Sequence, residues 1–194
     1  MSKKMSIQYI DPCPDPTHSI SRAELEAFFI FAVAVPGHNA KTTADAVVKL
    51  LNIYGKLTPL QMIEKMIVRG TLMKYLKRVR LGKYNSLSKT LHDSIKSGIN
   101  LRTCSVEDLM DIYGIGNKTS RFFILHTRPN QRLAVLDVHI LKWLRARGIT
   151  APRTTPQSQK EYRRLENIFL SYCDGFGMSA VALDSFIWKL SVMK

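Results

Sequence analysis

A lysine and an aspartate stand 19 positions apart near the middle of the chain, and both have surroundings that favour chemistry. Lys118 closely follows the glycine pair of Gly114-Ile115-Gly116, and Asp137 lies within the otherwise largely apolar run LAVLDVHIL. A lysine amine that has lost its proton can attack an electrophilic carbon or form a Schiff base. A carboxylate in an apolar setting is costly unless it has a partner or a function. The pair therefore suggests covalent catalysis by an amine, with an anion beside the reacting carbon.

Two short helices are expected on either side of the glycine pair. Ser105 is placed to cap a helix over 106–112, and a second helix is expected over 118–127. Glycine lets the backbone turn sharply and approach another surface. The free N–H groups at the start of the second helix, at Asn117, would attract a phosphate. This arrangement is typical of a helix-hairpin-helix DNA-binding motif, and a plain tight turn would show the same pattern.

Each of the two reactive residues also has a simpler interpretation. A helix N-terminus and partial desolvation both disfavour the ammonium form of Lys118, which favours a nucleophile, but a lysine that only binds phosphate could stand at the same position. Asp137 could cap a helix that starts at Val138. Capping and catalysis are compatible, because a cap position fixes the carboxylate. That carboxylate would stabilise the positive charge that develops on a sugar as its base leaves.

The remaining chain is predicted to be helical, and no segment has the alternation typical of a strand. The first helix is capped by Ser19 or Ser21 and stops near Pro36, and Glu24, three residues after Ser21, is placed to complete a capping box. The sequence 174–177, DGFG, is expected to form a turn, and 150–158 a linker. Further helices are expected at 40–51, from 59 through 67, at the C-terminal end of 133–147, at 161–172 and at 180–190. The predicted fold class is all-α.

The charge of the chain favours a polyanionic partner. Lys and Arg number 29 against 15 acidic residues, which gives a formal net charge of +14. Nine of these cations lie between Arg69 and Arg102, where Asp93 is the one acid. This stretch is the best sequence candidate for a surface that follows DNA phosphates. A basic protein without such a partner is the alternative.

The cysteines and the apolar segments bear on cofactors and location. Cys13, Cys104 and Cys173 lie far apart and form no CxxC pair, so we expect reduced thiols and neither zinc nor an iron–sulfur cluster. The apolar run 27–35 is too short to span a bilayer, which takes about 20 residues. No signal peptide is visible. We expect an intracellular monomer, in the cytoplasm or a nucleus, with no membrane partner.

The pattern Gly114-x-Gly116-x-Lys118, followed by VLDVH at 135–139, resembles the helix-hairpin-helix DNA glycosylase superfamily. More narrowly, it is similar to the compact 8-oxoguanine DNA glycosylases, as is the C-terminal ALDSFIW at 182–188. The resemblance covers most of residues 25–194 and is strongest from 106 to 144. It implies two helical lobes with an active-site cleft between them. The implied bounds are a helical barrel lobe at 30–132, which carries the motif at 106–127, and a second lobe made of 1–29 and 133–194.

The resemblance also implies an activity. A bifunctional DNA glycosylase and AP lyase would excise an oxidised purine, 8-oxoguanine, from double-stranded DNA after flipping the base out. Lys118 would be the nucleophile that forms the Schiff base, and Asp137 would assist the attack. No cofactor is implied beyond a sodium or potassium ion held by the backbone carbonyls of Met110, Ile112 and Ile115.

Further residues are assigned by the same resemblance. The implied DNA-binding residues are Gly114, Gly116, Asn117, His139, His38 and Asn39, and the implied base-pocket residues are Phe122, Trp188 and Lys194. Asn39 could instead cap a helix, and Trp188 could belong to the core. Phe122 stands where the larger enzymes of the family carry a cysteine. Two other functions stay open, namely a glycosylase of this fold for another damaged or modified base, and a non-catalytic module that binds undamaged duplex.

Overall fold

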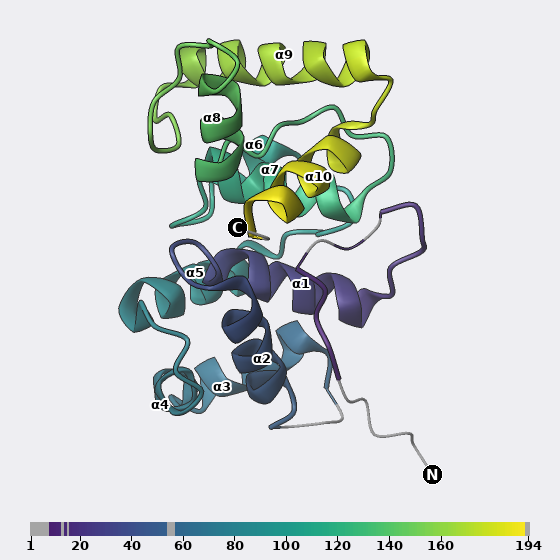
Figure 1. The fold of residues 1–194 in the computed structure, drawn as a ribbon. Helices are drawn as coiled ribbons and strands as arrows, with labels where there is room; N and C mark the ends of the chain where they lie inside the picture. The colour runs from purple at the N-terminus through teal and green to yellow at the C-terminus, as the bar shows by residue number, and fades with distance from the viewer. Residues whose placement is uncertain (1–7, 13, 15, 54–56, 193–194) are drawn as a thin grey trace. The chain divides into compact units, whose positions relative to one another are not determined.

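The computed structural model describes residues 8–12, 14, 16–53 and 57–192, and Figure 1 shows their fold. All regular secondary structure in these residues is α-helical, which confirms the predicted all-α class. The chain divides into two compact units, residues 1–14 with 18–116 and residues 15–17 with 117–194. These bounds differ from those of the predicted lobes, and the predicted cleft between two lobes stays a prediction. Within the described ranges, no helix has the length and apolar content that crossing a membrane requires.

The first unit is built around its most buried helix. It contains α1 (Arg22–Ala34), α2 (Ala40–Leu51), α3 (Pro59–Val68), α4 (Leu72–Arg78), α5 (Tyr84–Ser97) and α6 (Val106–Met110). Helix α1 packs against α2, α3 and α5, so nine of its 13 residues are buried. The predicted capping box is present, because Glu24 accepts a hydrogen bond from the Ser21 N–H at 2.9 Å and Ser21 caps in return.

The basic stretch between α3 and α6 behaves as the charge pattern predicts. Its apolar residues Leu76, Leu87 and Leu91 are buried. All nine cations are exposed, namely Arg69, Lys74, Lys77, Arg78, Arg80, Lys83, Lys89, Lys96 and Arg102. This part of the first unit therefore presents positive charge to solvent, as a phosphate-binding surface requires.

The second unit contains the residues with predicted chemistry. Its helices are α7 (Asn117–Thr127), α8 (Val138–Arg145), α9 (Gln159–Phe176) and α10 (Ala180–Val192). Helix α10 packs against α7, α8 and α9, and Figure 1 shows α8 at a steep angle to α9. Side chains from all four helices share one core, which includes Leu125, Leu144, Phe169 and Leu183. Lys118 and Asp137 both belong to this unit.

Two local predictions were wrong. The helix expected at 161–172 continues through Gly175 and ends at Phe176, and its C-cap Gly177 has a left-handed φ of 63°. Asp174 binds Arg132 in a bidentate pair at 2.8 and 2.9 Å. Tyr172 stacks on Phe176, and both rings contact Trp143 of α8. These tertiary contacts on both sides of Gly175 override its low helix propensity. The helix expected over 106–112 ends at Met110.

The segment 150–158 is irregular, as predicted, but it does not link two domains. Its carbonyls at Thr150 and Pro152 accept hydrogen bonds from Arg164 and Arg145. Both arginines belong to helices of the same unit. The segment is therefore part of the second unit and helps to hold it together.

Candidate active site

Lys118 lies on the less buried side of α7. Most of the helix is buried, whereas Lys118 and Phe122, one turn later, are half-buried. Among the described residues, the Lys118 amine has no hydrogen-bond or ion-pair partner. The position therefore suits a nucleophile, although it would also suit a lysine that binds phosphate.

Asp137 is the N-cap of α8. Its Oδ1 accepts hydrogen bonds from the backbone N–H groups of His139 at 2.8 Å and Ile140 at 2.9 Å. Its other oxygen has no hydrogen-bond partner among the residues that the structure describes. The carboxylate is half-buried. The capping interpretation is confirmed, and it leaves one oxygen available to interact with a substrate.

A buried aspartate on α10 interacts with both of these residues. Asp184 is 7% exposed and lies 3.2 Å from Nε2 of His126 on α7. Burial raises the pKa of the Asp184 carboxyl, and the hydrogen bond to His126 opposes that rise. The charge of Asp137 raises the same pKa, and the charge of Lys118 lowers it. The amine and the carboxylate predicted to act together thus belong to one unit, on α7 and at the start of α8, and the charge of each affects the pKa of Asp184 on α10.

Neither Asp184 nor His126 was predicted as a site residue. His126 also contacts Phe122, with ring centroids 5.1 Å apart in an edge-on arrangement. Phe122 is thus next to the histidine that contacts Asp184. Trp188 is half-buried one turn further along α10. Lys194, the third residue predicted for the base pocket, lies outside the described residues.

The two glycines of the hairpin differ in whether the fold could accept a larger residue. Gly114 has φ of +79°, and a Cβ there would lie 2.6 Å from Oγ1 of Thr90. Gly116 has no positive φ, and a Cβ there would meet no atom within 4 Å. The fold therefore requires glycine at 114. At 116, a requirement for glycine would come from a partner that approaches the backbone.

Replacing the two glycines by alanine should separate folding from binding. Gly114→Ala is expected to lower the free energy of unfolding by about 1–3 kcal/mol, because it adds backbone strain and a steric clash. Gly116→Ala is expected to leave stability within about 0.5 kcal/mol and to weaken binding of duplex DNA. Urea unfolding and fluorescence anisotropy would measure the two quantities. Unchanged DNA binding by Gly116→Ala would contradict the close approach of DNA to this residue.

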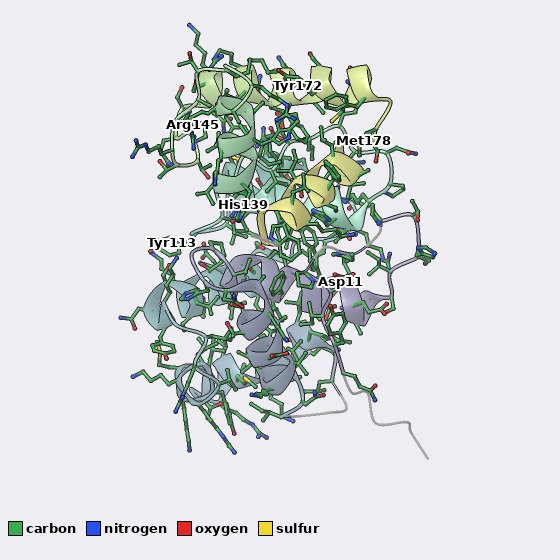
Figure 2. The ribbon with its side chains drawn as sticks, viewed as in Figure 1. Asp11, Tyr113, His139, Arg145, Tyr172 and Met178 are labelled. Carbon is green, nitrogen blue, oxygen red and sulfur yellow. The ribbon has the colours of Figure 1, made fainter. Side chains whose placement is uncertain are left out.

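Other contacts hold the hairpin in place within the first unit. The Tyr113 N–H donates to Oδ2 of Asp93 at 3.1 Å, and Nζ of Lys89 lies 3.8 Å above the Tyr113 ring. Tyr113 is 42% exposed and is labelled in Figure 2. Tyr113 was not among the predicted site residues. Its place in the hairpin, beside the basic stretch, was the available signal.

The other predicted DNA-binding residues differ in how far their side chains are exposed to solvent. His139 is half-buried in the first turn of α8 (Figure 2). The side chain of Asn117 is buried and accepts a hydrogen bond from Arg121 at 2.8 Å. A contact between Asn117 and DNA would therefore involve its backbone. Asn39 caps α2, because its Oδ1 accepts from the Thr42 N–H at 3.1 Å. Capping by Asn39 is confirmed, and the residue is still exposed to solvent.

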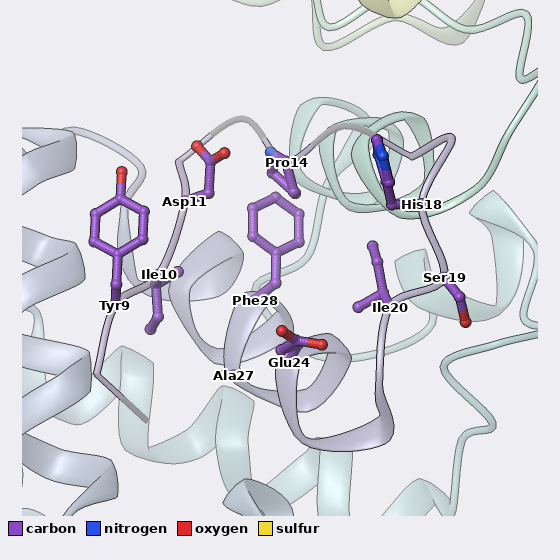
Figure 3. A pocket seen from close by; sticks show the side chains of 10 residues that line it. All are labelled: Tyr9, Ile10, Asp11, Pro14, His18, Ser19, Ile20, Glu24, Ala27 and Phe28. Carbon is purple, nitrogen blue, oxygen red and sulfur yellow. The ribbon is translucent and has the colours of Figure 1, made fainter. Parts of the chain in front are cut away.

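Two cavities lie in the first unit. One, of about 190 Å³, is polar and lined by His38, Asn39, Lys49 and Arg80 among others. The exposed His38 and Asn39 thus stand beside two cations, as a DNA contact would require. The second cavity, of about 240 Å³, lies between the N-terminal segment and α1 (Figure 3). It includes none of the predicted site residues.

Among the described residues, no group of three or more His, Cys, Asp or Glu side chains is placed to hold a metal ion. Cys104 and Cys173 are buried thiols that form no disulfide among the described residues, and burial raises the pKa of the Cys173 thiol to about 11. Cys13 lies outside the described residues.

Comparison with known proteins agrees with the resemblance seen in the motif. The model of the family described as 8-oxoguanine DNA glycosylase matches residues 19–178. The 8-oxoguanine DNA glycosylase/AP lyase of Thermoplasma acidophilum is 37% identical over 78 residues, 40% of this chain and 36% of that protein. The 8-oxoguanine DNA glycosylase/AP lyase of Thermotoga sp. strain RQ2 is 32% identical over 77 residues, 40% of this chain and 37% of that protein. The match thus spans little more than a third of the length of these relatives.

Solved structures share the fold over most of the chain. The 8-oxoguanine glycosylase/lyase of Methanocaldococcus jannaschii, solved with a 15mer DNA containing 8-oxoguanine, has a TM-score of 0.68 and 19% identity and covers 90% of this chain and 83% of that one. The 8-oxoguanine DNA glycosylase of Thermotoga maritima has a TM-score of 0.66 and 20% identity, with 87% and 79% covered. Because the family model matches most of the sequence, the chain belongs to the 8-oxoguanine DNA glycosylase family.

Proposed function

We propose that this protein is a DNA glycosylase with AP lyase activity that removes an oxidised purine, 8-oxoguanine, from double-stranded DNA. The observation that carries the proposal is that a chain matched over residues 19–178 by the 8-oxoguanine DNA glycosylase family model has Lys118 in the first turn of α7 and Asp137 fixed as the N-cap of α8, both in the second unit. The amine has no protein partner among the described residues, and the Asp137 carboxylate has one oxygen to spare. An accessible amine and a fixed anion are the two groups that Schiff-base removal of a base needs.

The reaction begins with a nucleotide flipped out of the duplex, because C1′ of a stacked nucleotide is out of reach. The neutral amine of Lys118 bonds to C1′ and gives up a proton, while the bond from C1′ to the base breaks and the base leaves with the electron pair and takes up a proton. Asp137 stabilises the positive charge on the sugar in this step. Opening of the sugar ring gives an imine between Lys118 and C1′. Removal of a C2′ proton then expels the 3′ phosphate, and water hydrolyses the imine.

Contacts with the DNA backbone would come from the basic stretch and the hairpin of the first unit, and from the start of α8. The nine exposed cations between α3 and α6 supply charge without sequence preference. Gly114, Gly116 and the backbone of Asn117 would approach a phosphate, and His139 a second one. His38 and Asn39, beside the polar cavity, would contact the strand near the lesion.

A monovalent cation would fit the hairpin carbonyls of Met110, Ile112 and Ile115. Carbonyl oxygens are ligands that sodium and potassium accept. The Ile112 carbonyl accepts one hydrogen bond, from the Ile115 N–H at 3.1 Å, and its second lone pair could face an ion. The bound ion would add positive charge next to a phosphate. No cofactor takes part in the chemistry of Lys118.

A panel of duplexes tests the proposed activity and substrate together. The duplexes share one sequence and carry 8-oxoguanine, another oxidised purine, an oxidised pyrimidine or guanine at a single position. We expect free base and a nicked strand from the 8-oxoguanine duplex, and neither from the guanine duplex, as measured by chromatography and a denaturing gel. Faster release of another base would change the assigned substrate. Duplex binding without release from any member would identify a non-catalytic DNA-binding module.

We also infer that one chain is the working unit and that it acts where the cell keeps its DNA. Lys118 and Asp137 belong to the same unit of one chain, so one copy supplies both groups for one flipped nucleotide.

A further inference from the structure

The segment that leads to Asp137, residues 134–136, is buried without being helical. Ala134 and Leu136 are both 0% exposed, and buried backbone N–H and C=O groups need partners. A tyrosine side chain from α9 supplies two of them. The Tyr162 hydroxyl donates to the Ala134 carbonyl at 2.8 Å and accepts from the Leu136 N–H at 3.1 Å. One oxygen atom thus joins the backbone on both sides of residue 135.

Two further side chains complete the pairing of this backbone. Glu166, one turn along α9 from the tyrosine, accepts from the Ala134 N–H at 2.9 Å. Thr155 donates its hydroxyl to the Leu136 carbonyl at 2.9 Å. The N–H and C=O groups of Ala134 and Leu136 are therefore all paired with side chains, and none is paired with the backbone of another described segment. The path of this segment is set by the positions of those side chains.

An arginine connects the same group of side chains to the start of α7. Arg121 donates to both oxygens of Glu166, at 2.8 and 3.4 Å, and to Oδ1 of Asn117 at 2.8 Å. Its guanidinium also lies over the ring of Tyr162, with Cζ 4.4 Å from the ring centroid. Asn117 immediately precedes Lys118. The arginine therefore bridges the helix that carries the amine and the segment that carries the carboxylate.

The carboxylate of Asp137 is held in a fixed position relative to its own backbone. Its Oδ1 is fixed by the N–H groups of His139 and Ile140, and its own N–H donates to the Val135 carbonyl at 2.6 Å. A shift of the backbone at 134–136 would therefore move the carboxylate. Catalysis is sensitive to such shifts, because a displacement of about 1 Å can lower a rate by about 10²-fold.

We propose that Tyr162, Glu166 and Arg121 are positioning residues that hold the carboxylate of Asp137 at its working distance from the amine of Lys118. This inference rests on the proposed function for its catalytic meaning. A buried arginine–glutamate pair is an expensive way to gain stability, since apolar residues of the same volume often serve as well. Its contacts to two functional segments give it a role that apolar residues could not perform.

Tyr162→Phe is the most conservative test, because it removes the one oxygen atom and keeps the ring. We expect the single-turnover rate of base release to fall by about 10²-fold, with little change in the Kd of the lesion duplex. The matched control is Tyr172→Phe, because the hydroxyl of Tyr172 has no hydrogen bond among the described residues. Thr155→Val removes one hydroxyl at a half-buried position and should lower the rate less than Tyr162→Phe does. It replaces Tyr162→Phe as the test variant if that protein folds poorly. A normal rate in both variants would overturn the proposal.

A double variant separates positioning from general loss of structure. If Tyr162 acts through Asp137, the rate of Tyr162→Phe/Asp137→Asn should equal that of Asp137→Asn alone. Losses that multiply would mean that Tyr162 acts independently of the carboxylate, and would overturn the proposal.

Amide hydrogen exchange tests the same inference without using activity. In Tyr162→Phe we expect faster exchange at Leu136, His139 and Ile140, with exchange in the first unit unchanged. Unchanged exchange at these three amides would overturn the positioning role even in an active enzyme. If the wild-type protein released no base from any duplex, the proposed function would fail, while the exchange result would still decide whether these side chains hold Asp137.

Discussion

Lys118→Gln should release no 8-oxoguanine and form no covalent adduct with DNA in the presence of borohydride. Borohydride reduces the imine between the enzyme and the sugar, so the adduct reports the nucleophile directly. Glutamine is similar in size but has no basic nitrogen. We expect the rate of base release to fall by at least about 10³-fold, as for other nucleophile deletions. Labelled duplex on a denaturing protein gel would show the adduct, and single-turnover kinetics would give the rate.

The control for Lys118→Gln is Lys160→Gln. Lys160 is exposed at the start of α9 in the same unit, so this variant loses the same charge elsewhere. It should keep both the adduct and the rate. Each variant should lose only the modest affinity that one cation contributes. An adduct that persists in Lys118→Gln would show that another amine forms the imine.

Asp137→Asn is expected to slow base release far more than it weakens DNA binding. Asparagine keeps the acceptor oxygen that caps α8, so the fold should change little. The negative charge that stabilises the sugar cation is lost, and we expect the rate to fall by about 10²–10³-fold. Single-turnover rates and Kd values for the 8-oxoguanine duplex would measure the two effects.

Comparison with Asp137→Ala identifies the part that capping plays. Alanine removes both the charge and the cap, so it should also lower the free energy of unfolding by about 1 kcal/mol. The two variants should have similar rates and different stabilities. If Asp137→Asn were as active as the wild type, the carboxylate would be a cap alone, and the proposed mechanism would need another anion.

The elements that could be predicted from the sequence are those specified by neighbouring residues. Ser21 and Glu24 form their capping box three positions apart, and Asp137 caps the helix that follows it. The hairpin and α7 were recognisable because glycine spacing and helix period are local signals. The end of α9 was mispredicted because Gly175 suggests a turn, whereas the ion pair of Asp174 with Arg132 is distant in sequence.

The side chains around the reactive pair could not be predicted for the same reason. Arg121 and Glu166 are 45 positions apart, and His126 and Asp184 are 58 positions apart. Nothing local in the sequence distinguishes Glu166 from the exposed acids and bases of an amphipathic helix. Only the packing of α9 and α10 against α7 and the segment before α8 brings these groups together.

The irregular segment before α8 has a consequence for how catalytic speed could evolve in this chain. The backbone of a strand in a sheet is held by the backbones of its neighbours. The backbone of this segment is held by a few side-chain hydroxyl and carboxylate groups, so a single substitution can shift its position. Selection for altered turnover should therefore favour substitutions at positions 155 and 162, which hold the backbone next to Asp137.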